Sequence, residues 1–138
     1  MMEIKSENVI INEKFPSSPI NKNTIINLII NKIKQNSIPK KIDYNELFLI
    51  IDEALTNAME HGNHWDPLKH VNVMITHKND YLIITIEDEG SGFDTENYNK
   101  TDTKNLNLRG RGIQIIKHFC NPVWNSTGNQ INFNIDIE

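Results

Sequence analysis

The sequence predicts a two-layer α/β (α+β) sandwich, with a mixed, antiparallel-rich sheet covered on one face by helices. Two segments in the first half of the chain carry apolar residues at helical spacing. Several short apolar runs elsewhere have the partial alternation that is typical of strands. Two of these runs are separated only by Lys78-Asn79-Asp80, which favours a hairpin and therefore an antiparallel pair.

The N-terminal half is expected to hold an edge strand and two helices. Asn8–Phe15 is short, apolar-rich and followed by prolines, as edge strands often are. Asn21–Gln35 has a broad apolar face at helical spacing. Asp43 is the expected N-cap of the second helix, because a glutamate follows three residues later. Gly62 and Asn63 mark the end of that helix.

The C-terminal half is expected to hold a hairpin, a long polar loop, a short helix and two closing strands. In chain order these are Val71–His77 and Tyr81–Glu87, the loop Thr95–Leu108, the helix opened by Gly110-Arg111-Gly112, and the strands Val123–Asn125 and Gln130–Ile137. The loop has few apolar anchors, so we expect it to be mobile, and loops of this length are usually functional. No repeat or long linker interrupts the chain, and residues 1–138 are expected to form a single domain.

Composition excludes several classes of protein. The net charge of −4 argues against a direct nucleic-acid partner, which would require a basic face. A single cysteine, Cys120, excludes an internal disulfide and a cysteine-based metal cage. No apolar run approaches the roughly 18 residues of a membrane helix, and the charged N-terminus lacks the apolar core of a signal peptide. We therefore expect a cytoplasmic protein that does not bind membranes.

The first candidate site lies on the second helix. Glu53, Asn57 and His61 are spaced four residues apart, so they share one polar face of an otherwise apolar helix. A carboxamide oxygen is a hard ligand that suits Mg²⁺, and a carboxylate can accept a proton from an attacking hydroxyl. The alternative is a solvated polar stripe, because such pairs are common on exposed helices.

The second candidate site is Asp88-Glu89-Gly90-Ser91-Gly92, directly after a strand. A carboxylate at a strand end can accept a hydrogen bond from an exocyclic amine such as that of adenine. Gly90 and Gly92 would let the backbone approach a flat ring. The alternative is an ordinary turn rich in Gly and Asp.

The third candidate site is Arg109-Gly110-Arg111-Gly112. Glycines at a helix start expose N–H groups that can bind phosphate, and the two arginines can add charge-assisted hydrogen bonds. The alternative is a basic loop-to-helix turn without a ligand. The motif is neither the dinucleotide G-x-G-x-x-G nor the phosphate loop G-x-x-x-x-G-K-[ST].

The joint order of these sites resembles the GHKL ATPase superfamily of gyrases, chaperones, histidine kinases and mismatch-repair proteins. The matching boxes are Glu53…Asn57…His61-Gly62, Asp88-x-Gly90-x-Gly92 and Gly110-x-Gly112. The form E-A-x-T-N-A-x-x-H-G is most similar to the bacterial anti-sigma-factor serine-protein kinases, which have a histidine-kinase-like ATPase domain.

The resemblance implies ATP and Mg²⁺ as cofactors and a role for each motif. Glu53 would be the general base, Asn57 would ligate Mg²⁺, and Asp88 would bind the adenine amine. The other nucleotide-binding residues that it implies are His61, Gly90, Gly92, Arg109, Gly110, Arg111 and Gly112. One of the two arginines is expected at the γ-phosphate, and the choice between them stays open. Many relatives carry G-x-G-T near the last strand, where this chain has Thr127-Gly128-Asn129-Gln130.

The resemblance implies a protein serine kinase that phosphorylates a small anti-sigma-factor antagonist protein and binds a sigma factor, with a homodimer left open. One alternative is a nucleotide-gated binding module without kinase activity, but such a module has no need of a base at Glu53. Another is a detached ATPase domain of a histidine kinase, against which we note that no spare dimerising helical hairpin is expected in the chain. Trp65 and Trp124 are interpreted as packing or interface residues.

Overall fold

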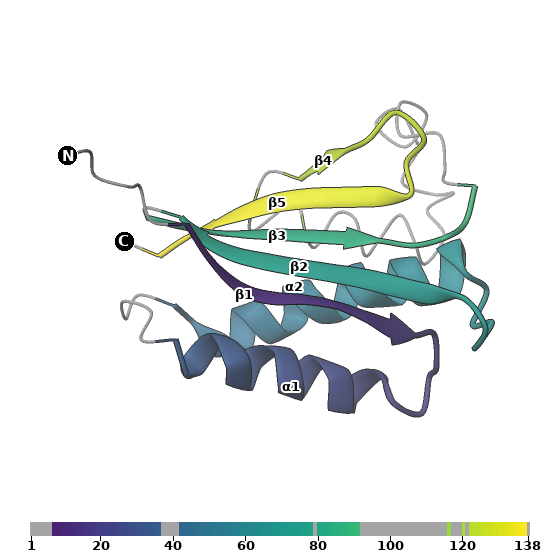
Figure 1. Ribbon diagram of the computed structural model, residues 1–138, viewed down its shortest axis with the longest axis horizontal. Coiled ribbons are helices and arrows are strands. Elements are labelled where there is room, and N and C mark those ends of the chain that lie inside the picture. Colours follow the sequence, from purple (N-terminus) through teal and green to yellow (C-terminus); the bar gives the residue numbers. More distant parts are fainter. Residues whose placement is uncertain are drawn as a thin grey trace, which may run out of the picture.

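The computed structural model describes residues 7–36, 42–78, 80–91, 116, 120 and 122–137. In this part of the chain, a five-stranded sheet forms one layer and helices form the other. Helices α1 (Lys22–Lys34) and α2 (Tyr44–Thr56) lie side by side on one face of the sheet (Figure 1). The predicted two-layer α+β fold is therefore confirmed.

The sheet has the strand order β1-β2-β3-β5-β4. The strands are β1 (Glu7–Pro16), β2 (His70–Lys78), β3 (Tyr81–Glu87), β4 (Val123–Trp124) and β5 (Gln130–Asp136). Every pair of neighbours among these strands is antiparallel. The predicted antiparallel character of the sheet is therefore confirmed. The sheet was also predicted to be mixed, but no parallel pair occurs between the described strands.

The core lies between the sheet and the two helices. Buried residues alternate along the central strands, as expected where one face of a sheet is covered. The largest buried side chains include Ile75, Leu82, Ile84, Ile86 and Phe133 from the sheet, and Ile26, Ile29, Ile33, Leu47, Ile51 and Leu55 from the helices. Burial of this apolar surface is the main favourable contribution to packing α2 against the sheet. This packing in turn positions the polar residues that α2 carries.

Strand β1 contains a bulge that the sequence pattern did not predict. Its pairing with β2 shifts between Val9 and Ile11. Ile10 and Ile11 are consecutive, and both are buried. The extra residue of a bulge breaks strict alternation, which explains how two neighbouring isoleucines contribute to the same core.

Helix α2 begins as the sequence predicts but ends differently. Asp43 is the N-cap, and its Oδ1 accepts hydrogen bonds from the backbone N–H groups of Asn45 and Glu46 at 3.0 and 3.2 Å. The expected single α-helix instead ends at Thr56 and continues as a π-helical segment, η1 (Asn57–Gly62). Wider π turns are frequent at functional sites, and this one contains Asn57 and His61.

Several predicted features lie outside the described residues. They are Gly92, the loop Thr95–Leu108, and the Arg109-Gly110-Arg111-Gly112 motif. Of the short helix predicted after that motif, the structure describes Ile116, which is helical and buried in the core. No helix within the described ranges is long and apolar enough to cross a membrane.

Candidate functional site

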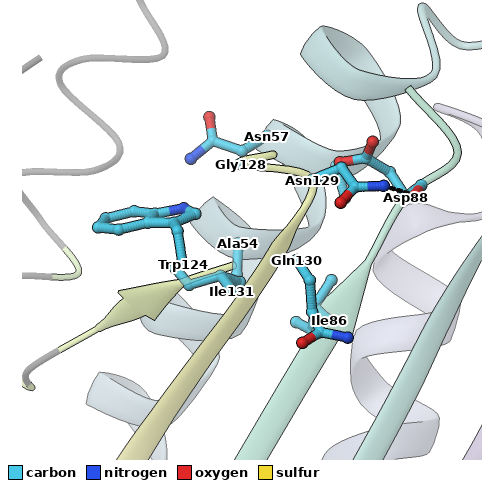
Figure 2. Close-up of a pocket in the computed structure, with 10 residues that line it drawn as sticks. Ala54, Asn57, Ile86, Asp88, Trp124, Gly128, Asn129, Gln130 and Ile131 are labelled. Atoms are coloured by element: carbon cyan, nitrogen blue, oxygen red, sulfur yellow. Dashed lines mark hydrogen bonds between the residues drawn. The ribbon is translucent and has the colours of Figure 1, made fainter. Parts of the chain in front are cut away.

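A pocket lies between α2, η1 and the β4–β5 hairpin (Figure 2). It is lined by Ala54, Asn57, Ala58, Ile86, Asp88, Trp124, Gly128, Asn129, Gln130 and Ile131. The space between these residues is about 290 Å³, open solvent at the mouth included. The pocket brings together Asn57 from the first predicted motif and Asp88 from the second, which are far apart in the sequence.

Asp88 follows β3 directly and is only 6% exposed. Its Oδ1 accepts a hydrogen bond from the Gly90 N–H at 2.7 Å. The Asp88 N–H donates to the Asn129 carbonyl at 2.9 Å, and the Asn129 side chain donates back to the Asp88 carbonyl at 3.1 Å. These bonds hold the Asp88 backbone against the start of β5, so the carboxylate enters the pocket from a fixed position.

Two glycines allow the end of η1 to approach the turn after β3. A Cβ on Gly62 would overlap the Asp88 carboxyl group, and a Cβ on Gly90 would overlap the Gly62 carbonyl. The predicted role of Gly90 was to make room for a ligand ring, but the space that it leaves is filled by Gly62. The helical segment ends at the predicted residues, because η1 stops at Gly62 and Asn63 is its C-cap. The positive φ angles fall just beyond it, at His64 and Trp65.

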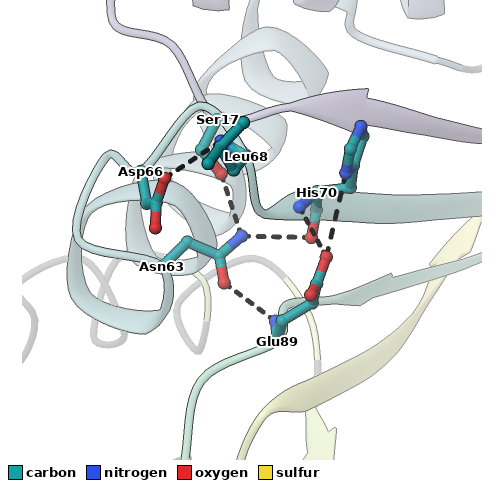
Figure 3. A network of polar contacts seen from close by, with 6 residues as sticks. All are labelled: Ser17, Asn63, Asp66, Leu68, His70 and Glu89. Carbon is teal, nitrogen blue, oxygen red and sulfur yellow. Dashed lines mark hydrogen bonds and ion pairs between the residues drawn. The ribbon is translucent and has the colours of Figure 1, made fainter.

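Buried Asn63 connects the end of η1 to three other segments (Figure 3). Its Nδ2 donates to the Ser17 hydroxyl at 2.9 Å and to the His70 carbonyl at 3.0 Å. Its Oδ1 accepts from the Glu89 N–H at 2.8 Å. The Glu89 carboxylate in turn accepts from the His70 N–H at 2.7 Å. Asn63, which the sequence indicated only as a helix end, therefore positions the turn that carries Asp88.

Glu53 and His61 are not among the residues that line the pocket. Glu53 lies on α2 one helical turn before Asn57 and is partly buried. The pKa of its carboxyl group is raised, first by burial and then by the nearby Asp52 charge, while Lys22 lowers it. His61 has its Nε2 atom 3.9 Å from a Glu60 carboxylate oxygen. The structure thus places Asn57 and Asp88 at the pocket, Glu53 beside it, and His61 outside its lining.

Lys22 connects the two helices close to Glu53. Lys22 at the start of α1 forms an ion pair with Asp52 at 2.6 Å and donates to the Thr56 hydroxyl at 2.9 Å, which connects α1 to α2 near Glu53.

The Cys120 thiol donates a hydrogen bond to the Ile116 carbonyl. Burial, and then the charge of Glu46, raise the pKa of Cys120 to about 11. The thiol is therefore protonated at neutral pH and is a poor nucleophile.

The β4–β5 hairpin supplies pocket residues that sequence reasoning did not assign to the site. Trp124 was interpreted as a packing or interface residue, and it both packs against the core and lines the pocket. Asn129 stands in the segment where many relatives carry G-x-G-T, and it bonds the Asp88 backbone. That departure from the pattern was the one sequence signal that pointed to this hairpin.

One pocket residue, Asn57, carries an oxygen ligand of the kind that Mg²⁺ prefers. The described residues contain no cluster of three or more His, Cys, Asp or Glu side chains that could hold a metal ion. Mg²⁺ usually keeps several waters and takes few protein ligands together with substrate phosphates. The Asn57 carboxamide oxygen at the pocket fits that role.

The histidine kinase-like ATPase domain matches residues 15–135 of the chain. This chain belongs to that family. Domains of this family bind ATP, so the pocket between α2 and the β4–β5 hairpin is the candidate ATP site of this ATPase domain. The match also agrees with the predicted resemblance at the level of the superfamily.

The ATPase domain is also similar to part of known sensor proteins. It is 31% identical over 87 residues to the sensor protein VraS of Staphylococcus aureus strain COL. It is 30% identical over 87 residues to the sensor protein VraS of Staphylococcus epidermidis strain ATCC 12228. Each match covers 63% of this chain and 24% of the relative. The chain therefore spans about a quarter of the length of these curated relatives.

Replacing Asn63 with alanine should destabilise the protein and weaken nucleotide binding. The change removes the hydrogen-bond partners of Ser17, His70 and Glu89. Leaving buried polar groups unpaired costs about 1–3 kcal/mol each, so we expect a loss of about 2–4 kcal/mol in the free energy of unfolding. Denaturant unfolding and calorimetry with ADP measure the two effects. Asn132→Ala, at an exposed position of β5, is the control. Its free energy of unfolding and its affinity for ADP should stay close to those of the parent. A parent-like Asn63→Ala would contradict the positioning role.

Replacing Glu53 with glutamine should make stability less sensitive to pH. Since the pKa of Glu53 is raised in the folded protein, its contribution is fully present at low pH and is lost as the pH rises through the folded-state pKa. The variant should therefore be more stable than the parent at neutral pH, and the difference should shrink as the pH falls. Unfolding across the pH range tests this, with Glu13→Gln on the exposed part of β1 as control. A variant less stable than the parent at neutral pH would contradict it.

Proposed function

We propose that this ATPase domain is a protein serine kinase of the anti-sigma-factor type. It binds ATP with Mg²⁺, transfers the γ-phosphate to a serine of a small antagonist protein, and binds a sigma factor in its second role. The observation that carries the kinase proposal is a carboxyl group with a raised pKa, Glu53, one helical turn from the pocket residue Asn57. A domain that only binds nucleotide has no need of that carboxylate.

In the binding step, the nucleotide occupies the pocket that Asn57 and Asp88 line. The buried Asp88 carboxylate suits an N–H donor, such as the exocyclic amine of adenine. Asn57 would hold Mg²⁺ through its amide oxygen, and the ion would supply positive charge that binds the phosphates. Asp88 and Asn57 line the same pocket, so one nucleotide can reach both side chains.

In the transfer step, Glu53 accepts the proton of the serine hydroxyl. The hydroxyl oxygen then forms a bond to the γ-phosphorus, the bond to the β,γ-bridging oxygen breaks, and ADP leaves. A general base works best when its pKa lies near the working pH. Burial raises the pKa of the Glu53 carboxyl group, which moves it in the favourable direction.

The similarity to the VraS sensor proteins favours a second candidate. The chain would then be the ATPase domain of a histidine kinase and would deliver phosphate to a histidine. The two candidates share ATP binding and differ in the acceptor. The chemistry of the product separates them, because phosphoserine survives acid, whereas phosphohistidine is lost in acid and survives alkali.

Incubation of the chain with γ-labelled ATP and small candidate antagonist proteins from the same genome tests the proposal. We expect label on a candidate protein that resists acid and that maps to serine. Acid-labile label on a histidine would support the second candidate instead. Nucleotide binding without label on any candidate would favour a binding module and would contradict the kinase proposal.

Replacing Glu53 with glutamine should separate binding from transfer. Loss of a general base slows the chemical step by about 10²–10⁴-fold, whereas the affinity for ATP should stay within a few-fold. Asn57→Ala is the contrasting variant, because it should weaken Mg²⁺-dependent ATP binding itself. Labelling rates and calorimetry measure the two quantities. Equal losses of affinity and rate in Glu53→Gln would contradict a base and indicate a structural or metal-linked role.

A further inference from the structure

We propose that Trp124 forms an aromatic wall of the candidate ATP site and packs its indole against the purine ring of the nucleotide. This inference deepens the proposed function and rests on its ATP-binding step. It assigns a nucleotide contact to a residue that lies outside all three sequence motifs.

The placement of Trp124 in the pocket is the first observation. It ends β4, pairs with Ile131 of β5, and lines the same pocket as Asn57 and Asp88. The indole extends from β4 in the region of Ala54 and Asn57, while Asp88 lies at the far side of the Gly128-Asn129 turn (Figure 2). Since Trp124, Asn57 and Asp88 line one pocket, a nucleotide that fills this pocket can also meet the indole.

The other pocket residues suit a flat ring with one polar edge. Ala54 and Ala58 are small, are four residues apart on the helix, and are both buried. Ile86 and Ile131 add apolar surface from the sheet. Asp88 supplies the buried carboxylate. An adenine ring can direct its amine at the carboxylate while its faces meet apolar and aromatic groups, whereas a ribose or a phosphate chain has no such flat apolar face.

The turn that follows Trp124 fixes its position relative to Asp88. The Asn125 Oδ1 accepts from the N–H groups of Gly128 and Asn129 at 2.7 and 3.1 Å. The Asn125 Nδ2 donates to the Asn129 Oδ1 at 2.7 Å. Asn129 in turn bonds the Asp88 backbone through both its carbonyl and its side chain. One hydrogen-bonded turn thus connects the residue after Trp124 to the backbone of Asp88, so the backbone on this side of the pocket is already ordered before the nucleotide binds.

Stacking of a base on an aromatic side chain has a measurable effect. Removing such an aromatic ring typically weakens binding by about ten-fold or more. Because Trp124 also packs against the core, the test needs a readout that leaves this residue in place. The chain has only two tryptophans, and the second, Trp65, is not among the pocket residues.

The first experiment measures fluorescence in Trp65→Phe, in which Trp124 is the sole tryptophan. We expect ADP and adenosine to change its emission and to protect it from acrylamide, with the same affinity for ADP that calorimetry gives. Tripolyphosphate, which has no base, should leave the emission unchanged. In the matched variant Trp124→Phe, the remaining tryptophan should not respond to adenosine. ADP binding by calorimetry without any response of Trp124 would overturn the inference.

The second experiment measures ADP affinity in Trp124 variants by calorimetry. Trp124→Ala should bind about ten-fold more weakly, and Trp124→Phe, which keeps an aromatic face, should stay within a few-fold of the parent. Thermal unfolding identifies any variant that fails to fold, in which case the Phe variant and the fluorescence decide. If a folded Trp124→Ala binds ADP as tightly as the parent, the inference about Trp124 is overturned and the ATP-binding proposal stands. Failure of the parent chain to bind ADP would overturn the ATP-binding proposal together with it.

Discussion

The contact between the end of η1 and the turn after β3 is the constraint on which the candidate site depends. A Cβ on Gly62 would overlap the Asp88 carboxyl group, and a Cβ on Gly90 would overlap the Gly62 carbonyl. This contact sets Asp88 from the sheet beside the helix that carries Asn57. Since Asn63 bonds the Glu89 N–H and Asn129 bonds the Asp88 carbonyl, the Asp88 carboxylate is positioned by backbone packing and by amide side chains.

The helix that carries the first motif is suited to connect binding with chemistry. The α-helical part of α2 is fixed by core packing and by the Lys22–Asp52 ion pair, and it holds Glu53 in a partly buried position. The segment then changes to a π-helix at Asn57. The change falls between Glu53, the proposed base, and Gly62 at the end of the motif. One continuous segment therefore carries both Asn57, which lines the pocket, and Gly62, which packs against Asp88.

Local patterns predicted most of the fold and part of the site. Alternation and helical spacing placed the described strands and helices, and the cap at Asp43, because these signals are carried by neighbouring residues. The bulge at Ile10 and the π-helical segment depend on tertiary packing, so no short pattern revealed them. The close approach of Gly90 to Gly62 also depends on tertiary packing, and no short pattern revealed it. Trp124 and Asn63 were missed as site residues because their roles arise from contacts between distant segments.

Competition between ATP and GTP for the pocket tests the central claim that buried Asp88 reads the base. Guanine presents a carbonyl where adenine presents an amine, and an unpaired polar contact costs about 1–3 kcal/mol. The parent chain should therefore prefer ATP by ten-fold or more, and Asp88→Asn should lose most of that preference. Asp80→Asn, at an exposed position of the β2–β3 hairpin, should keep it. Equal affinity of the parent chain for ATP and GTP would contradict the account.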